Sequence, residues 1–194
     1  MNIVKEFKET YKEIPREVKR FLKRALLIFV IWKLLYGFFL YPSRFPDKQL
    51  THLISAGTEQ ILSKIYPDMN FMVGETCELD SDKQFFCYDY VMMGHQKIIV
   101  IADGCNGLEL IALYAGFLFC IPAAIGKMTA YTILGIAMIG ICNILRCAGL
   151  AWMNFHHYTL TGLAHHYVFK VVIYGLIFGV WIFYSRGSIN TSDE

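Results

Sequence analysis

Four apolar runs constrain this chain more than any other feature of its sequence. Each run has 17 or 18 residues, and together they cover residues 25–41, 108–124, 129–145 and 167–184. An α-helix needs about 17 residues at minimum to cross the hydrocarbon core of a bilayer. The sequence therefore predicts a mainly α fold, a polytopic membrane helical bundle with about four transmembrane spans.

Composition supports a membrane protein and excludes other classes. Of the 194 residues, 56% are hydrophobic and 18% are charged. A disordered chain would need low hydrophobicity and high net charge. The net charge of +2 gives no indication of nucleic-acid binding. We therefore expect contact with membrane lipid and no nucleic-acid partner.

The location of charge predicts the side of the membrane on which each segment lies. Residues 1–24 hold eight basic residues and four glutamates, whereas residues 42–104 hold five basic residues against nine acidic ones. Because basic segments next to spans stay in the cytoplasm, we expect a cytoplasmic basic amphipathic leader, an outer loop over residues 42–107 and a cytoplasmic tail over residues 185–194. No small-residue cleavage site follows the first run, so it is predicted to be an anchor. Residues 25–184 would form a single integral domain of the cytoplasmic (inner) membrane.

The outer loop changes its periodicity twice. Its first part follows helical spacing, which predicts an amphipathic helix on the outer surface or against the bundle, with apolar positions at Leu50, Leu53, Ile54, Gly57, Ile61 and Ile65. Residues 85–88 and 97–101 are strand-like runs with a turn between them, which predicts a small extracytoplasmic β element. Residues 147–163 are expected to form an interfacial or re-entrant helix. A fifth crossing there would instead move the C-terminus outside.

The cysteines fall into three groups by their predicted depth. Cys77 and Cys87 lie in the outer loop, where either a disulfide or two free thiols is possible. Cys120 and Cys142 lie within spans and are expected to be small apolar fillers. Cys105 lies between two glycines at the outer mouth of the second span. A helix N-terminus at that point would favour a nucleophilic thiolate.

Three predicted spans bring polar groups to the depth of Cys105. Arg146 ends the third run, and Asn143 lies one helical turn before it on the same face. His165 and His166 open the fourth run at that level. A cysteine nucleophile needs a nearby base or cation, and acyl transfer needs a donor where negative charge develops. The set therefore indicates acyl-transfer chemistry, although an interfacial anchor is the ordinary role of an arginine such as Arg146.

These motifs resemble those of the exosortase and archaeosortase family of membrane cysteine transpeptidases. The resemblance covers roughly residues 100–184 and is closest to the compact exosortases of Bacteroidetes. It rests on Cys105-Asn106-Gly107-Leu108, on Asn143-Ile144-Leu145-Arg146 and on a later histidine. It implies catalytic roles for Cys105, Arg146 and a histidine, with Asn143, Asn106 and Gly107 in support. An asparagine directly after the nucleophile departs from the small residue often found there and leaves the oxyanion geometry open.

The two adjacent histidines cannot both face the site, because neighbours on a helix point about 100° apart. His166 shares a helical face with Lys170, whereas His165 shares one with Gly175 and Gly179. Since a polar face is expected to turn toward the site, His166 is the predicted catalytic histidine and His165 is held in reserve.

The resemblance also implies a substrate class and a reaction. Substrates would be exported proteins with a C-terminal sorting signal, which is a short motif, one transmembrane helix and a basic cluster. The enzyme would cleave at the motif through an acyl-thioester on the outer face and transfer the new carboxyl to an unknown acceptor, sorting the protein to the cell surface. No metal and no cofactor are expected.

Two rival functions come from other classes. His156, His157, His165 and His166 could bind a metal or haem near the outer surface. Alternatively, the chain could be a non-catalytic membrane assembly factor.

Overall fold

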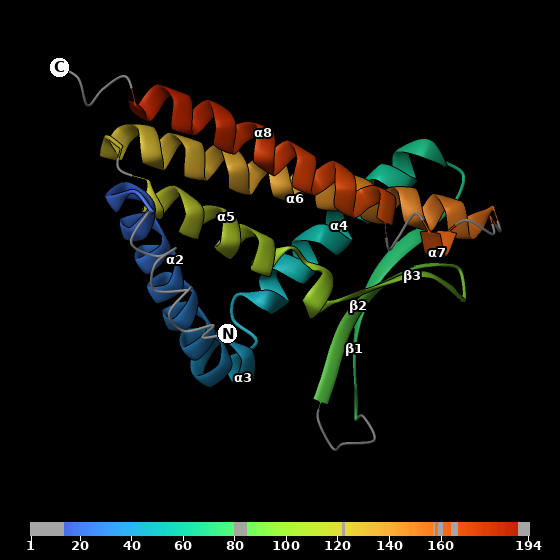
Figure 1. Cartoon of the computed structure of the whole chain (residues 1–194). Helices are drawn as coiled ribbons and strands as arrows, with labels where there is room; N and C mark the ends of the chain where they lie inside the picture. The colour runs from blue at the N-terminus through green and yellow to red at the C-terminus, as the bar shows by residue number, and fades with distance from the viewer. Residues whose placement is uncertain are drawn as a thin grey trace, which may run out of the picture.

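The computed structural model describes residues 14–79, 85–121, 123–156, 158, 161–163 and 167–189. Figure 1 shows long helices that lie lengthwise beside one another, with a small sheet at one end. The helical elements are α2 (Arg16–Leu35), the π-helical segment η1 (Tyr36–Leu40), α3 (Tyr41–Ser43), α4 (Asp47–Ile65), the 3-10 turn η2 (Asp103–Cys105), α5 (Leu108–Cys120), α6 (Ile125–Phe155), α7 (Thr161–Leu163) and α8 (Phe169–Ile189). The strands are β1 (Phe71–Leu79), β2 (Phe85–Met93) and β3 (Gln96–Ala102).

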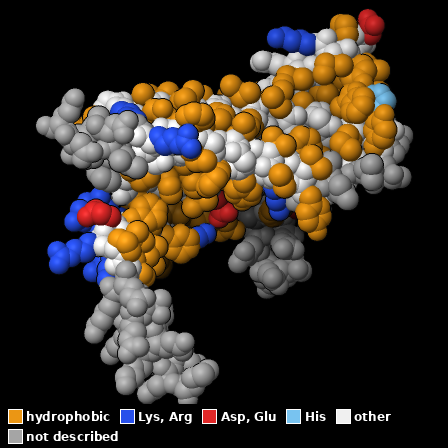
Figure 2. All heavy atoms as spheres, turned by 45° about the horizontal axis from the view of Figure 1, so that its top comes forward, with side chains coloured by type: hydrophobic (Ala, Val, Ile, Leu, Met, Phe, Trp, Pro, Cys, Tyr) orange, Lys and Arg blue, Asp and Glu red, His pale blue; other side chains and the backbone are white. Residues whose placement is uncertain are grey.

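Within the described residues, three helices are long and apolar enough to cross a membrane: the run Arg16–Ser43, α6 and the part of α8 from Phe169 to Arg186. Their outward faces carry large apolar side chains, and Figure 2 shows such side chains over much of the molecular surface. A surface patch of this extent is not typical of a soluble monomer. The prediction of a mainly helical membrane protein is confirmed.

The second predicted span is shorter than expected. Helix α5 has 13 residues, which is about 20 Å at 1.5 Å per residue, and it ends at Cys120 instead of residue 124. The cause is local, because a proline at position 122 disfavours helical geometry in the residue before it. Ile121 is indeed extended, with φ −98° and ψ 121°.

The prediction for residues 147–163 is wrong over its first nine residues. Residues 147–155 form neither a separate interfacial helix nor a fifth crossing, because they continue α6, an unbroken helix of 31 residues. The sequence from 125 to 155 contains no proline, and Cys147, Leu150 and Ala151 are buried in the core beside α4 and the sheet. Arg146 therefore lies within a helix and does not end one.

The two ends of the chain also differ from the expected boundaries. Residues 16–24 of the predicted leader are the first turns of α2, and residues 1–13 lie outside the described part of the chain. Helix α8 extends to Ile189, so the predicted tail begins as helix, and residues 190–194 lie outside the description.

The sheet is antiparallel in the order β1-β2-β3. The predicted strands at 85–88 and 97–101 are confirmed within β2 and β3, whereas β1 was not predicted. Cys77 of β1 lies opposite Cys87 of β2, and a disulfide joins them, which decides the alternative that the sequence left open.

Helix α4 is confirmed as a helix, but its buried face is not the predicted apolar stripe. Leu53 and Ile65 of that stripe are more than half exposed. Four of its six buried residues are polar, namely Asp47, Thr51, Ser55 and Thr58, and the other two are Ile54 and Leu62. The Ser55 and Thr58 hydroxyls donate to backbone carbonyls four residues earlier, so they are buried without an unsatisfied group. Small side chains also let α4 approach α6 closely.

Candidate active site

The turn that carries Cys105 joins the sheet to the membrane helices. Strand β3 runs directly into η2, and α5 begins at Leu108. Between them Gly107 adopts φ 89°, a left-handed conformation that other residues rarely adopt. This places Cys105 just before the N-terminus of α5, as the sequence predicted.

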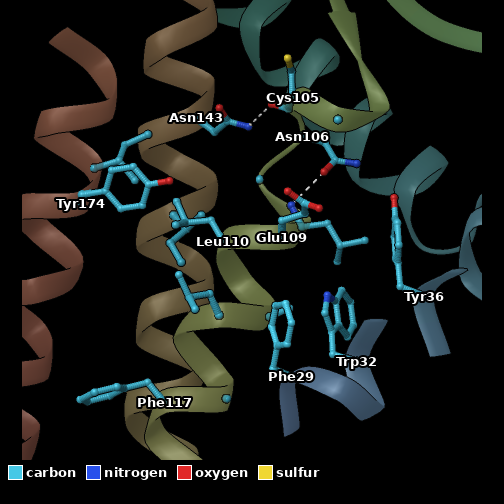
Figure 3. A pocket seen from close by; sticks show the side chains of 18 of the residues that line it. Phe29, Trp32, Tyr36, Cys105, Asn106, Glu109, Leu110, Phe117, Asn143 and Tyr174 are labelled. Carbon is cyan, nitrogen blue, oxygen red and sulfur yellow. Dashed lines mark hydrogen bonds between the residues drawn. The ribbon is translucent and has the colours of Figure 1, made fainter. Parts of the chain in front are cut away.

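The structure brings Cys105, Asn143 and Arg146 together. The Asn143 Nδ2 donates to the Cys105 carbonyl at 2.9 Å, and Figure 3 shows this bond. The Arg146 Nη1 donates to the Asn143 Oδ1 at 3.3 Å. One amide thus links the guanidinium to the backbone of the cysteine turn, because positions 143 and 146 share a face of α6.

Two cavities meet at Cys105 and Arg146. The larger has a volume of about 650 Å³, and its wall is mainly apolar, with side chains from α2, α5, α6 and α8 such as Phe29, Trp32, Leu113, Phe117, Ile139 and Tyr174. The smaller has a volume of about 280 Å³ and lies between β3, the end of α6 and α7. In Figure 3 the Cys105 sulfur points away from the aromatic side chains of the larger cavity. The thiol is half-buried, whereas Cys147 is only 3% exposed.

Both predicted histidines, His165 and His166, lie outside the described residues. The described residues on either side of them line the two cavities. Thr161 and Gly162 line the smaller cavity, and Phe169 and Lys170 line the larger one.

Asn106 is held by a network that sequence reasoning missed. Its side chain is 2% exposed, and its Nδ2 donates to the Asp47 Oδ1 at 2.8 Å and to the Thr51 Oγ1 at 3.2 Å. Its Oδ1 accepts from the Leu108 backbone N–H at 2.8 Å. The Tyr36 hydroxyl donates to the second Asp47 oxygen. Asn106 therefore ties the cysteine turn to α4, and its amide is directed away from the thiol (Figure 3).

Asp103 anchors the same turn from its other side. Arg44 donates to both Asp103 oxygens, at 2.8 and 3.2 Å, and the Thr51 hydroxyl donates to one of them. The hydrogen bond to Asp103 raises the pKa of the Arg44 guanidinium. Glu75 of β1 also accepts a hydrogen bond from Arg44 and forms an ion pair with Lys48. The hydrogen bonds from Lys48, which has the larger effect, and from Arg44 lower the pKa of the Glu75 carboxyl. The polar spacing of Asp47 and Thr51, four residues apart, was the available sequence signal.

Lys33 shows how a charge in the first apolar run is accommodated. Its ammonium pairs with the Glu109 carboxylate of α5 at 3.3 Å, and the pair lies on the rim of the larger cavity.

The described residues contain no group of three or more His, Cys, Asp or Glu side chains that could hold a metal ion. The His156 ring contacts the Trp152 backbone carbonyl at 2.9 Å and lies against the Trp152 and Tyr66 rings. His157 lies outside the description with His165 and His166.

No protein-family model matches this chain, and neither a curated protein nor a solved structure matches it.

Proposed function

We propose that this protein is a membrane cysteine transpeptidase of the exosortase type, which cleaves C-terminal sorting signals of exported proteins and transfers the new carboxyl to an acceptor. The observation that carries the proposal is the hydrogen-bonded unit of Cys105, Asn143 and Arg146 at the junction of two cavities. A nucleophile, a fixed cation and space on both sides of them are what cleavage within a chain requires.

The larger cavity fits the apolar helix of a sorting signal. Its wall includes Phe29, Leu113 and Tyr174, each more than half exposed, so the cavity is open toward lipid. A helix is about 10–12 Å across, so the cavity would take one face of the substrate helix and leave the other to lipid. The substrate carbonyl would then lie at the end of the cavity beside Cys105.

The charge at the far end of the bundle supports an outward-facing site. The Lys127 ammonium at the start of α6 donates to the Tyr184 carbonyl near the end of α8, so these two ends lie together. Arg24 of α2 lies close enough to Cys120, the last residue of α5, to affect it electrostatically. The start of α6 and the end of α8 lie at the end of the bundle opposite the sheet (Figure 1), so these basic residues belong to that end. By the positive-inside rule that end is cytoplasmic, and Cys105 faces out of the cytoplasmic membrane.

The depth of the site agrees with this orientation. From Ile125 to Asn143, α6 rises about 27 Å, close to the thickness of the hydrocarbon core. The short α5 covers about 20 Å of the same depth, so the proposed second crossing is shorter than the other three.

The reaction proceeds in two steps, acylation of Cys105 and transfer of the acyl group to the acceptor. The Cys105 thiol gives its proton to a base, and its sulfur attacks the scissile carbonyl carbon. The carbon–nitrogen bond then breaks, the departing amine takes the proton, and an acyl-thioester remains. The acceptor then gives its proton to the base and attacks the thioester carbon. The carbon–sulfur bond breaks, and the sulfur takes that proton, which restores the thiol. Arg146 stabilises the oxyanion, and Asn143 positions Arg146.

His166 is the proposed base. Phe169, Lys170, Ile173 and Tyr174 all line the larger cavity, and they stand three, four, seven and eight positions after residue 166. On a helix these positions share a face with residue 166. Of the four corresponding positions for His165, Phe169 and Ile173 line the cavity, but Val168 and Val172 do not, and their side chains are about half exposed.

The test is Cys105→Ser in the native membrane, with C-terminal processing of exported proteins as the readout. The candidates for processing are proteins of the same genome that end in a shared short motif, an apolar helix and Lys or Arg. Serine is nearly isosteric but far less nucleophilic, so the protein is expected to insert while unprocessed precursors accumulate. Cys147→Ser, which alters the buried thiol beside Arg146, is the matched control and is expected to process normally.

Four outcomes would contradict the proposal. Continued processing in Cys105→Ser excludes this cysteine as the nucleophile. Loss of processing in Cys147→Ser alone moves the nucleophile to that thiol. If the protein still functions normally with either substitution, it is an assembly factor. Bound metal or haem in the purified protein would favour the histidine-based alternative.

A further inference from the structure

Strand β3 is an edge strand of the sheet and lies beside the candidate nucleophile. Among the described residues it pairs only with β2, so one edge carries backbone N–H and C=O groups that the sheet does not use. One of these groups has a side-chain partner, because the Asn154 Nδ2 of α6 donates to the Ile98 carbonyl at 3.1 Å. The chain of β3 continues through η2 to Cys105.

The smaller cavity lies along this edge. Ile99, Val100 and Ile101 line it from β3, and Leu150 and Asn154 line it from α6. Cys105 and Arg146 belong to its wall as well as to the wall of the larger cavity. The candidate nucleophile thus separates a cavity beside a strand edge from a cavity beside apolar helices.

We propose, on the basis of the proposed function, that the substrate residues preceding the scissile carbonyl bind in the smaller cavity as an extended strand parallel to β3. An extended peptide is the one occupant that offers backbone donors and acceptors at the spacing of a strand edge. Main-chain hydrogen bonds would supply affinity. The cavity wall would contact alternate side chains and so read the sorting motif.

The direction follows from the order of the two cavities. This chain itself passes from β3 through Cys105 into the membrane along α5 (Figure 1). A substrate that runs in the same direction places its exported part outside, its motif along β3, its scissile bond at Cys105 and its apolar helix in the larger cavity. An antiparallel substrate would direct its apolar helix away from the membrane, where it would be exposed to water.

Disulfide mapping tests this binding mode. The probe is an exported protein whose processing is lost in Cys105→Ser, with single cysteines placed at successive positions before its scissile bond. The enzyme carries Cys105→Ala, so that bound substrate is not cut, together with either Val100→Cys or Ala102→Cys. We expect Val100→Cys to cross-link, and Ala102→Cys to cross-link to a substrate residue about two positions closer to the scissile bond.

The matched control is Met72→Cys on β1, the other edge strand. Met72 is 53% exposed and Val100 is 49% exposed, so the two thiols have similar access to reagent. Equal cross-linking from both positions, no cross-linking from Val100→Cys, or a reversed order for Ala102→Cys would overturn the proposal. These results would leave the proposed function intact. The proposed function is tested separately and is excluded if the Cys105→Ser protein still processes its substrates.

A second variant tests the cavity without new thiols. Among the described residues, a Cβ at Gly162 would meet nothing within 4 Å, so Gly162→Trp is expected to fold and to fill the smaller cavity. We expect processing to fall at least tenfold, while Gly126→Trp, at an equally open position at the start of α6, processes normally. Normal processing in a folded Gly162→Trp protein would exclude this cavity as the motif site.

Discussion

The turn around Cys105 is held from two sides, and the two supports differ in kind. On the α6 side, Asn143 and Arg146 contact the turn through one amide, next to two open cavities. On the α4 side, Asp47, Thr51 and Asn106 are at most 3% exposed and satisfy one another. The Arg146 guanidinium borders both cavities and can act on a substrate. Asp47 and Asn106 also border the larger cavity, but their hydrogen bonds are directed to one another and to Thr51, so they hold the backbone of the turn. The comparison predicts that substitutions on the α6 side reduce activity and those on the α4 side reduce stability.

The largest effect is expected for Arg146→Lys. An ammonium lacks the planar fork of a guanidinium and cannot reproduce its geometry toward Asn143 and an oxyanion. We expect processing to fall by about 10²–10³-fold with thermal unfolding in detergent unchanged. Rates of substrate processing, measured beside the unfolding temperature, check both parts. Full activity would mean that this arginine is only an interfacial anchor.

A smaller effect, on stability, is expected for Thr51→Val. The substitution keeps the shape of the side chain but removes a hydroxyl that donates to Asp103 and accepts from Asn106. Leaving buried partners unsatisfied costs about 1–3 kcal/mol, so the unfolding temperature should fall while the folded fraction keeps most of its activity.

Thr58→Val provides the control on the same helix. Thr58 is as fully buried as Thr51, but its hydroxyl donates only to the backbone carbonyl of Ile54 in its own helix. We expect it to lower stability by less than about 1 kcal/mol. Equal losses in the two variants would show that the network contributes nothing beyond hydroxyl burial.

The smallest effect is expected at the rim of the network, for Glu75→Gln. Lys48 and Arg44 lower the pKa of Glu75 below its ordinary value of 4.5, so its ionised form stabilises the fold. That contribution is present above the unfolded pKa and is lost as the pH falls through the lower folded pKa. Because the pair is partly exposed, we expect a difference under about 1 kcal/mol at pH 7. Unfolding measured from pH 7 down to pH 3 should show the wild type and the variant converging, and a constant difference would exclude the carboxylate as its source.

Several features could be predicted from the sequence because they depend on neighbours along the chain. Apolar runs of membrane length predict the helices whatever packs against them. The spacing of Asn143 and Arg146 places them on one face of any helix. These local facts were enough to bring Cys105, Asn143 and Arg146 into one candidate site.

Tertiary structure decided the features that depend on distant partners. The sequence of α6 allows a helix to end or continue after Arg146, and it continues because Cys147, Leu150 and Ala151 pack against α4 and the sheet. Strand β1 has little apolar alternation and exists through its pairing with β2. The buried side of α4 is polar because it forms hydrogen bonds with Asn106 and Asp103. Both of these residues lie more than 50 positions away in the sequence. Burial and hydrogen bonding depend on contacts between residues that are distant in the sequence. Such contacts produce no periodic pattern along the chain, so the sequence alone does not predict them.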